Sequence, residues 1–240
     1  MPIIFSLLSF LSTLAGGLFG IKFRDKKHLI LGFTAGVLLA LVAFDIFPEI
    51  FRLLNSTGLD IMWVMVSFTT AFIFFHILEK VIMMHYAQED AYHEHKHPTV
   101  GIVSSIALIG HSFLDGVGIG LAFQVSNNVG IIVAVAVIAH DFSDGLNTAS
   151  IMLMNANSKK KTFIFVILDS LAPIFGVLIS MVFIFPESWL LIYLGFFAGF
   201  LLYLSAADIL PEAHREKSSY ATLFMTLVGV MFIFLVTRFV

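Results

Sequence analysis

Residues 29–51 read LILGFTAGVLLALVAFDIFPEIF, a run that holds no lysine or arginine and only two acids, Asp45 and Glu49. A bilayer core of about 30 Å needs roughly 20 predominantly apolar residues per helix, so this run is long enough to cross a membrane. Seven further stretches have the same character. The eight predicted spans are about 2–21, 29–51, 61–84, 100–124, 129–154, 162–185, 188–209 and 220–239.

The composition agrees with a chain that crosses a membrane many times. Apolar residues make up 59% of the 240 residues and charged residues only 12%, whereas an average soluble domain carries about 25% charge. The net charge of −3 leaves no basic face for a nucleic acid, and the absence of cysteine removes thiolate metal sites. We therefore expect an all-α polytopic membrane protein, formed by one transmembrane transporter domain over residues 1–240.

Part of the run at 29–51 has a second copy near the other end of the chain. Residues 35–50 read AGVLLALVAFDIFPEI, residues 198–213 read AGFLLYLSAADILPEA, and ten of the sixteen positions are identical. The copies fall in predicted helices 2 and 7, which cross in opposite directions. Inverted repeats are common in secondary transporters. We expect helices 1–3 and 6–8 to be inverted repeats around helices 4 and 5.

The basic residues predict the orientation. Eleven of the thirteen lysines and arginines lie in the odd-numbered connections, and only Arg52 and Arg238 lie on the other side. Because cytoplasmic loops are enriched in lysine and arginine, both termini should face outside. The predicted location is the cell membrane, plasma or inner, as a multi-pass protein.

Helices 4 and 5 carry matched motifs. Helix 4 holds His111-Ser112-Phe113-Leu114-Asp115-Gly116 and helix 5 holds His140-Asp141-Phe142-Ser143-Asp144-Gly145. Residues four apart lie on one face of a helix, so each motif forms an imidazole–carboxylate pair. If the helices pack side by side, His111, Asp115, His140 and Asp144 supply four ligands that suit Zn²⁺ and related divalent ions.

A second cation could lie beside the first. Ser112 is three residues from Asp115, and Asp141 is three from Asp144, so oxygen ligands could hold another ion with Asp115 and Asp144 bridging. Asp169 could join them, because Pro173 cannot donate to the carbonyl of Asp169, which leaves that carbonyl and the carboxylate free at one level. Gly116 and Gly120 form a G-x-x-x-G that would allow the close approach this centre requires.

Further acids and histidines lie along the other helices, where ionisable residues are costly and are candidates for function. Those near the ends of helices 2, 3 and 7 could form entrance and exit routes or be ordinary hydrated or packed residues. They are Asp45, Glu49, His76, Glu79, Asp208, Glu212 and His214. A predicted cytosolic loop of about 85–99 is rich in histidine and could capture metal or be a plain connector.

At these residues the chain resembles the ZIP (Zrt-/Irt-like) family of divalent metal transporters. The resemblance rests on eight spans with outside termini, the histidine-bearing loop, the H-S-x-x-D-G and H-D-x-x-D-G motifs, and the Pro-Glu endings of helices 2 and 7. It implies import of zinc, iron, manganese or similar ions toward the cytosol, movement of helices 4 and 5, and a homodimer. It also implies a central site at His111, Asp115, His140 and Asp144, with Ser112 and Asp141 at a second metal position.

The chain departs from the family pattern at three positions. Ser112 stands where many members have asparagine, Asp144 where glutamate is usual, and Ala172-Pro173 where some members have Glu-Pro. These changes bear on the second metal position more than on transport.

The leading hypothesis is therefore a secondary transporter that moves divalent transition metals, zinc first, by alternating access through a midplane His/Asp site. Iron, manganese, cobalt and cadmium are further substrates to test. The metal would be a bound substrate, with no catalytic cofactor. The alternative is an intramembrane zinc-dependent hydrolase, against which the absence of H-E-x-x-H counts. A proton- or sodium-coupled carrier of an organic solute is a third hypothesis, disfavoured by the missing basic residues and the paired imidazoles.

Overall fold

The computed structural model describes residues 1–22, 27–90, 98–215 and 219–239, and for residues 27, 79, 82–90 and 215 it describes the backbone alone. Within these ranges every regular element is helical, as the sequence predicts. The elements are α1 (Pro2–Lys22), α2 (Lys27–Leu41), η1 (Val42–Ile46), α3 (Phe47–Thr57), α4 (Ile61–Asp90), α5 (Pro98–Val125), α6 (Asn127–Met154), α7 (Lys159–Ser180), α8 (Glu187–Tyr203), η2 (Leu204–Ile209), α9 (Leu210–Arg215) and α10 (Tyr220–Phe239).

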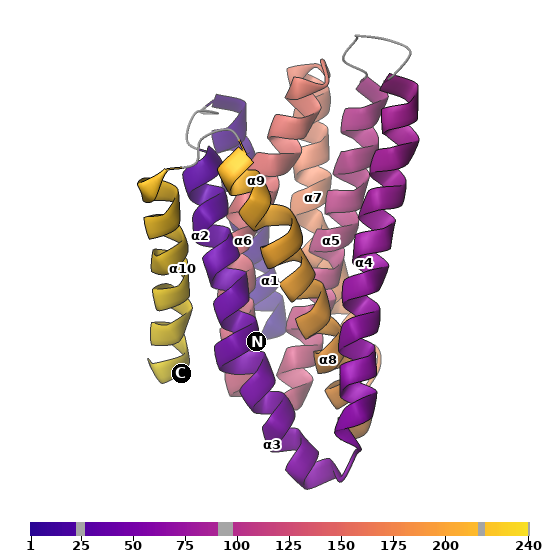
Figure 1. Ribbon diagram of the computed structural model, residues 1–240, viewed down its shortest axis with the longest axis vertical. Helices are drawn as coiled ribbons and strands as arrows, with labels where there is room; N and C mark the ends of the chain where they lie inside the picture. Colours follow the sequence, from indigo (N-terminus) through magenta and orange to yellow (C-terminus); the bar gives the residue numbers. More distant parts are fainter. Residues whose placement is uncertain (23–26, 91–97, 216–218, 240) are drawn as a thin grey trace.

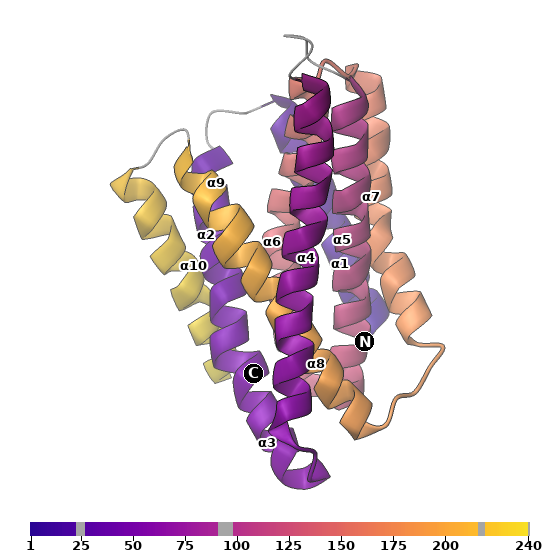
Figure 2. The same ribbon diagram turned by 45° about the vertical axis from the view of Figure 1, so that its right-hand side comes forward.

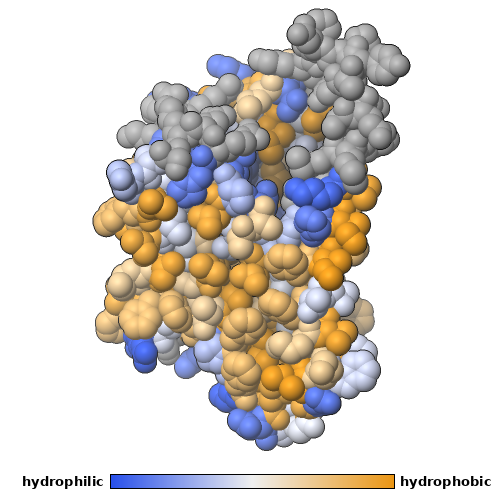
Figure 3. Space-filling view, in the orientation of Figure 1, coloured by the Kyte–Doolittle hydropathy of each residue, from blue (hydrophilic) through white to orange (hydrophobic). Residues whose placement is uncertain are grey.

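Eight helical stretches among the described residues are long and apolar enough to cross a membrane. They correspond to the eight predicted spans, and apolar side chains cover the middle of the face shown in Figure 3. Both termini lie in the half of the bundle opposite to the start of α7, where Lys159–Lys161 lie (Figure 1). The side of the membrane that each end faces stays a prediction.

Four helix ends differ from the predicted ones by five or six residues, and the third and seventh spans run on to Asp90 and Arg215. The second span continues to Thr57, because the chain stays helical until Gly58 adopts a left-handed conformation with φ 65°. The sixth span ends at Ser180 and not at residue 185, although the sequence remains apolar. There the side-chain amide of Gln124 donates to the carbonyls of Ser180 and Phe183, at 2.9 and 2.8 Å, and holds the chain outside a helix.

Both copies of the repeat contain a π-helical turn just before the proline. The Phe47 N–H donates to the carbonyl of Val42, five residues back, and the Leu210 N–H donates likewise to Ser205. Proline cannot donate to the residue four before it, and a π turn is one way to rearrange the bonds around that gap. The copies run in opposite directions (Figure 1), while the inverted relation of the three-helix halves stays a prediction.

Glycines hold neighbouring helices at backbone contact in four pairs. A Cβ atom on Gly145 of α6 would overlap the carbonyl oxygen of Thr13 on α1, and one on Gly176 of α7 would overlap that of Phe113 on α5. The same interlocking joins α2 to α10 and α4 to α8. In both Figure 1 and Figure 2, α10 lies on the outer side of α2, away from α5 and α7.

The G-x-x-x-G of α5 allows a close approach to α7. Added Cβ atoms on Gly116 and Gly120 would overlap Pro173 and Ser180, both on α7. The sequence did not say which helix these glycines would meet, because the spacing places both on one face of a helix without naming the neighbour of that face.

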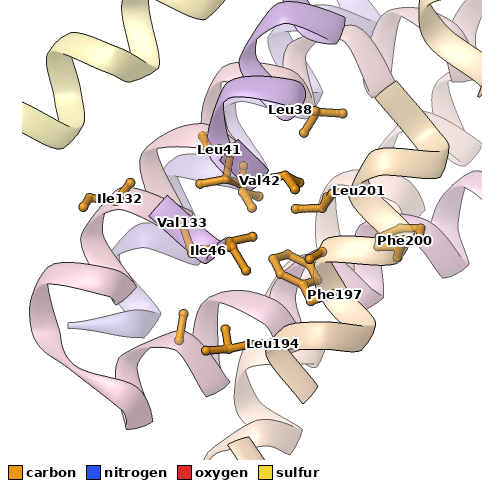
Figure 4. Close-up of a cluster of buried hydrophobic side chains, with 14 of the residues drawn as sticks. Leu38, Leu41, Val42, Ile46, Ile132, Val133, Leu194, Phe197, Phe200 and Leu201 are labelled. Carbon is orange, nitrogen blue, oxygen red and sulfur yellow. The ribbon is translucent and has the colours of Figure 1, made fainter. Parts of the chain in front are cut away.

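The helix pairs meet along a core of larger apolar side chains. Figure 4 shows Leu41 and Ile46 of the α2–η1 stretch beside Val133 of α6, with Phe197 and Leu201 of α8 completing the cluster. These side chains are buried. The interface between the α1–α5–α6–α7 group and the remaining helices is thus formed by aliphatic and aromatic side chains. Within the helix pairs on either side of this interface, glycines allow backbone contact.

Candidate metal centre

The two matched motifs meet in the middle of the bundle. A single residue, Ser126, joins α5 to α6, and its side chain caps α6 by accepting from the Val129 N–H at 3.2 Å. So short a connection makes the two helices antiparallel neighbours. His111, Asp115, His140 and Asp144 each offer a ligand atom, and the four atoms lie within 4.8 Å of one another. We call these four residues the central cluster.

Each imidazole of the central cluster faces both carboxylates. His111 Nε2 lies 3.0 Å from Asp115 Oδ2 and 3.4 Å from Asp144 Oδ2. His140 Nε2 lies 3.3 and 3.6 Å from the same two oxygens. Ligands of a tetrahedral Zn²⁺ are roughly 3.4 Å apart when each metal–ligand bond is about 2.1 Å long. The arrangement therefore has the dimensions of a four-ligand metal site.

The surroundings orient the two rings. Nδ1 of His140 lies 3.0 Å from the backbone carbonyl of Ala136, so it carries the hydrogen and Nε2 keeps its lone pair for the centre. The ring of His111 packs against Phe200 of α8, with 5.0 Å between ring centroids. Both imidazoles thus present Nε2 to a common point.

Three polar atoms of the central cluster are withdrawn from solvent and are not satisfied by a hydrogen bond to the described part of the chain. They are His111 Nε2, Asp115 Oδ1 and Asp144 Oδ2, of which the first and the last have only the imidazole–carboxylate contacts already given. A buried polar atom without a partner costs about 1–3 kcal/mol, and more when it is charged. The only ion-pair partners that the described residues give these carboxylates are histidines. A divalent cation would supply the missing interaction for both ligand types.

The residues of the predicted second metal position lie beside the central cluster but are bound differently. Asp169 of α7 accepts hydrogen bonds from Ser112 at 2.7 Å and from Thr148 at 2.8 Å. Asp141 accepts from Ser9 of α1 through Oδ2, and its Oδ1 lies 3.8 Å from His140 Nε2. The carboxylate of Asp169 is therefore not free, contrary to the expectation drawn from Pro173.

Ser9 and Thr148 were not predicted to take part. Both lie in apolar helices, where a hydroxyl ordinarily bonds to the carbonyl one turn earlier, as Ser150 does with Leu146 at 2.7 Å. One signal was present in the sequence, because Thr148 lies four residues after Asp144 and continues its face of the helix. Ser9 carries no such signal, since only tertiary packing brings α1 to Asp141.

The predicted route residues are spread over both ends of the bundle. Asp45 in η1 is buried, and its Oδ2 makes no hydrogen bond to the described residues. Glu49 is paired with Arg52 one turn later. His76 of α4 is exposed and its ring lies 5.8 Å from that of Tyr203. Asp208 in η2 is exposed.

The structure gives less detail for the remaining predicted route residues and for the histidine-bearing loop. Glu212 and His214 are partly buried in α9, while the side chain of Glu79 lies outside the described residues. The histidine-bearing loop begins later than predicted, because α4 stays helical through Asp90, with no glycine or proline to end it earlier. The remaining positions of that loop, 91–97, lie outside the described residues, so a metal-capturing role for it stays a prediction.

Comparison with known proteins identifies a protein family. The family model described as ZIP Zinc transporter matches residues 84–237, which include both motifs of the central cluster and the second copy of the repeat. No curated protein matches the chain.

Proposed function

The chain belongs to the ZIP zinc transporter family, and from that premise we propose that it carries divalent transition-metal ions, zinc foremost, across the membrane toward the cytosol. The observation that supports this most strongly is the central cluster. Two imidazoles and two carboxylates converge in an apolar bundle, and three of their buried polar atoms are not satisfied by a hydrogen bond within the described residues. A divalent cation is the ligand that satisfies all of them.

The donor set favours zinc but admits other metals. Imidazole with carboxylate suits Zn²⁺, and the same ligands also accept iron, manganese, cobalt and cadmium ions, since selectivity depends on geometry and metal availability. Ser112, Asp141 and Asp169 are our candidates for a second metal position. An ion there would have to displace the hydroxyl hydrogen bonds that Asp169 now accepts.

Burial of the central cluster supports alternating access. The side chains of His111, Asp115, His140 and Asp144 are 9%, 0%, 0% and 3% exposed. An ion can reach or leave such a site only when the helices around it rearrange. We propose that Asp45 and Glu49 guide the ion at the outer end, and that the acids and histidines at the other end receive it. The latter are His76, Glu79, Asp208, Glu212 and His214.

The setting we propose is a cell membrane, plasma or inner, with both termini outside and two copies of the chain forming a homodimer. The excess of lysine and arginine at one end of the bundle supports the orientation. With this orientation, movement from Asp45 toward α9 is import.

Uptake by reconstituted protein tests the proposal. Proteoliposomes that contain the wild-type chain should accumulate Zn²⁺ in response to a Zn²⁺ gradient, and His111→Ala or Asp144→Ala should abolish this uptake. His28→Ala and Asp60→Ala are matched controls outside the central cluster and should transport like the wild type. Unchanged uptake in both cluster variants would reject the site assignment.

The hydrolase alternative predicts a different result. A catalytic zinc keeps one coordination position open for water, usually with three protein ligands, whereas the central cluster presents four. That count supports transport. Ceramide or peptide hydrolysis by the purified protein, without metal flux, would reverse the ranking.

A further inference from the structure

Three buried oxygen atoms within five residues of α6 make no hydrogen bond to the described residues. They are Ser143 Oγ, Asp144 Oδ2 and Asn147 Oδ1. Of these, only the oxygen of Asp144 belongs to the central cluster. We call the three atoms the oxygen triad.

Helical spacing places the oxygen triad on one face of α6. Asn147 follows Asp144 by three residues and Ser143 by four, so its side chain neighbours both, while Ser143 and Asp144 themselves lie about 100° apart around the helix. Other sides of α6 are covered by other helices. Gly145 meets Thr13 of α1 at backbone contact, and Thr148 donates to Asp169 of α7. Ser143 lies at the level of the central cluster, between His140 and Asp144, and Asn147 extends it by about one turn toward Met154, the end of α6 that leads to Lys159–Lys161.

The hydroxyl of Ser143 behaves unlike other buried serines in these helices. Ser105, Ser150 and Ser170 each donate to the carbonyl four residues earlier, at 2.7 Å in every case. Ser143 is fully buried and does not make that bond. A helical serine within a membrane normally satisfies its hydroxyl in this way, because no water is at hand. Its hydroxyl is thus available to a ligand.

We propose that the oxygen triad is a second station for the transported divalent cation, which receives the ion as it leaves the two imidazoles. This proposal rests on the proposed function, since it assigns a step to the same transport. Asp144 belongs to both stations, so the ion can pass from one to the other without losing its charged ligand. Oxygen ligands without imidazole hold Zn²⁺ more weakly. The station therefore favours release toward the Lys159–Lys161 end.

The ligand chemistry also predicts how the metals differ. Oxygen ligands suit Mn²⁺, whereas imidazole suits Zn²⁺. Substitutions in the oxygen triad should therefore reduce Mn²⁺ transport more than Zn²⁺ transport. Loss of an imidazole from the central cluster should reduce Zn²⁺ transport more than Mn²⁺ transport.

The test separates transport rate from equilibrium binding. Asn147→Leu keeps the side-chain size and removes the oxygen, and we expect it to lower the initial rate of Zn²⁺ uptake into proteoliposomes about tenfold. Ser143→Ala should lower it a few-fold. The matched control is Ser150→Ala, the same substitution on the same helix at a hydroxyl that is already bonded, which should transport like the wild type. Zn²⁺ affinity, measured by competition with a chelating dye, should stay within about twofold for all three.

Wild-type rates in both Ser143→Ala and Asn147→Leu would overturn the second station, and so would a loss of Zn²⁺ affinity that matches the loss of rate. Asn147→Asp retains an oxygen and should transport faster than Asn147→Leu; equal rates would also overturn it. If Asn147→Leu does not fold, equal rates in Ser143→Ala and Ser150→Ala overturn the station on their own. Absence of uptake by the wild type would instead reject the proposed function.

Discussion

Two sets of buried carboxylates lie side by side in the bundle and are held in different ways. Asp115 and Asp144 of the central cluster face imidazoles, while Asp141 and Asp169 accept hydrogen bonds from the hydroxyls of Ser9, Ser112 and Thr148. We call Asp115 and Asp144 the central pair, and Asp141 and Asp169 the outer pair. Asp169 accepts two hydroxyl hydrogen bonds and Asp141 accepts one, while Asp141 Oδ1 makes no hydrogen bond to the described residues. The central pair faces imidazoles, whose Nε2 atoms can bind a metal. A cation at the central pair would replace contacts with imidazole nitrogens, whereas at Asp169 it would have to displace two hydroxyl hydrogen bonds.

The outer pair can also support the central one. Asp169 ties Ser112 of α5 and Thr148 of α6 to α7, and so fixes the two helices that carry the ligands. Hydrogen-bonded neighbours that orient metal ligands commonly contribute about 10- to 100-fold in metal affinity. The outer pair then positions the residues of the central cluster. Substitutions in the outer pair and in the central cluster should separate these two roles.

The largest effect is expected from Asp115→Asn. Its Oδ2 lies within hydrogen-bonding distance of both imidazoles, so the neutral amide removes a charged ligand that both histidines face. We expect Zn²⁺ uptake to fall more than about 100-fold and the rise in melting temperature on adding Zn²⁺ to disappear. Asp169→Asn is the matched control in the outer pair and should retain more Zn²⁺ uptake. Equal losses of Zn²⁺ uptake in Asp115→Asn and Asp169→Asn would show that the central cluster and the outer pair do not differ in role.

Gly116→Ala should disturb the hydrogen bonding of the outer pair while leaving α5 and α6 in contact. The added methyl group would overlap the carbonyl of Pro173 and force α5 away from α7, which separates Ser112 from Asp169. Overpacking of this kind costs about 1–3 kcal/mol, visible as a lower melting temperature in detergent. Gly110→Ala, on the same helix and with open space around it, should stabilise by about 0.5–1 kcal/mol through helix propensity. Destabilisation by both would contradict the packing explanation.

Thr148→Val measures how much one hydroxyl contributes to the uptake rate. The substitution keeps the shape and removes one of the two donors to Asp169. We expect a loss of about 1 kcal/mol, or roughly fivefold in uptake rate, with one tightly bound Zn²⁺ per chain in both proteins by elemental analysis. Two ions per chain in the wild type, falling to one in Asp169→Asn, would mean that a metal displaces these hydrogen bonds, as the second metal position requires.

The smallest effect is expected from Arg52→Gln. Arg52 pairs with the buried Glu49, but the Arg52 side chain is 61% exposed, so solvent screens the interaction. Stability should change by less than about 0.5 kcal/mol and uptake by less than twofold. A severe loss of uptake would place Arg52 in the transport route itself.

The sequence predicted the parts of this molecule that depend on local spacing. Spans follow from the length of apolar runs, and the central cluster follows from two His-x-x-x-Asp pairs on consecutive helices. It did not predict that Gly116 meets α7, or that Ser9 and Thr148 bind the outer carboxylates, because those contacts join segments far apart in the chain. The end of α7 was missed for a similar reason, since the side chain that holds the following residues lies on α5.

Gln124 also determines where the α7–α8 connection can bend. Besides the carbonyls of Ser180 and Phe183, it accepts a hydrogen bond from the Phe185 N–H at 3.1 Å, so that connection is attached to α5 almost to its end. Only Pro186 remains before α8 begins at Glu187, and the ring of proline fixes its φ angle, here −58°. Any rotation of α8 relative to α5 then falls on three torsion angles beyond the Phe185 N–H, namely φ and ψ of Phe185 and ψ of Pro186.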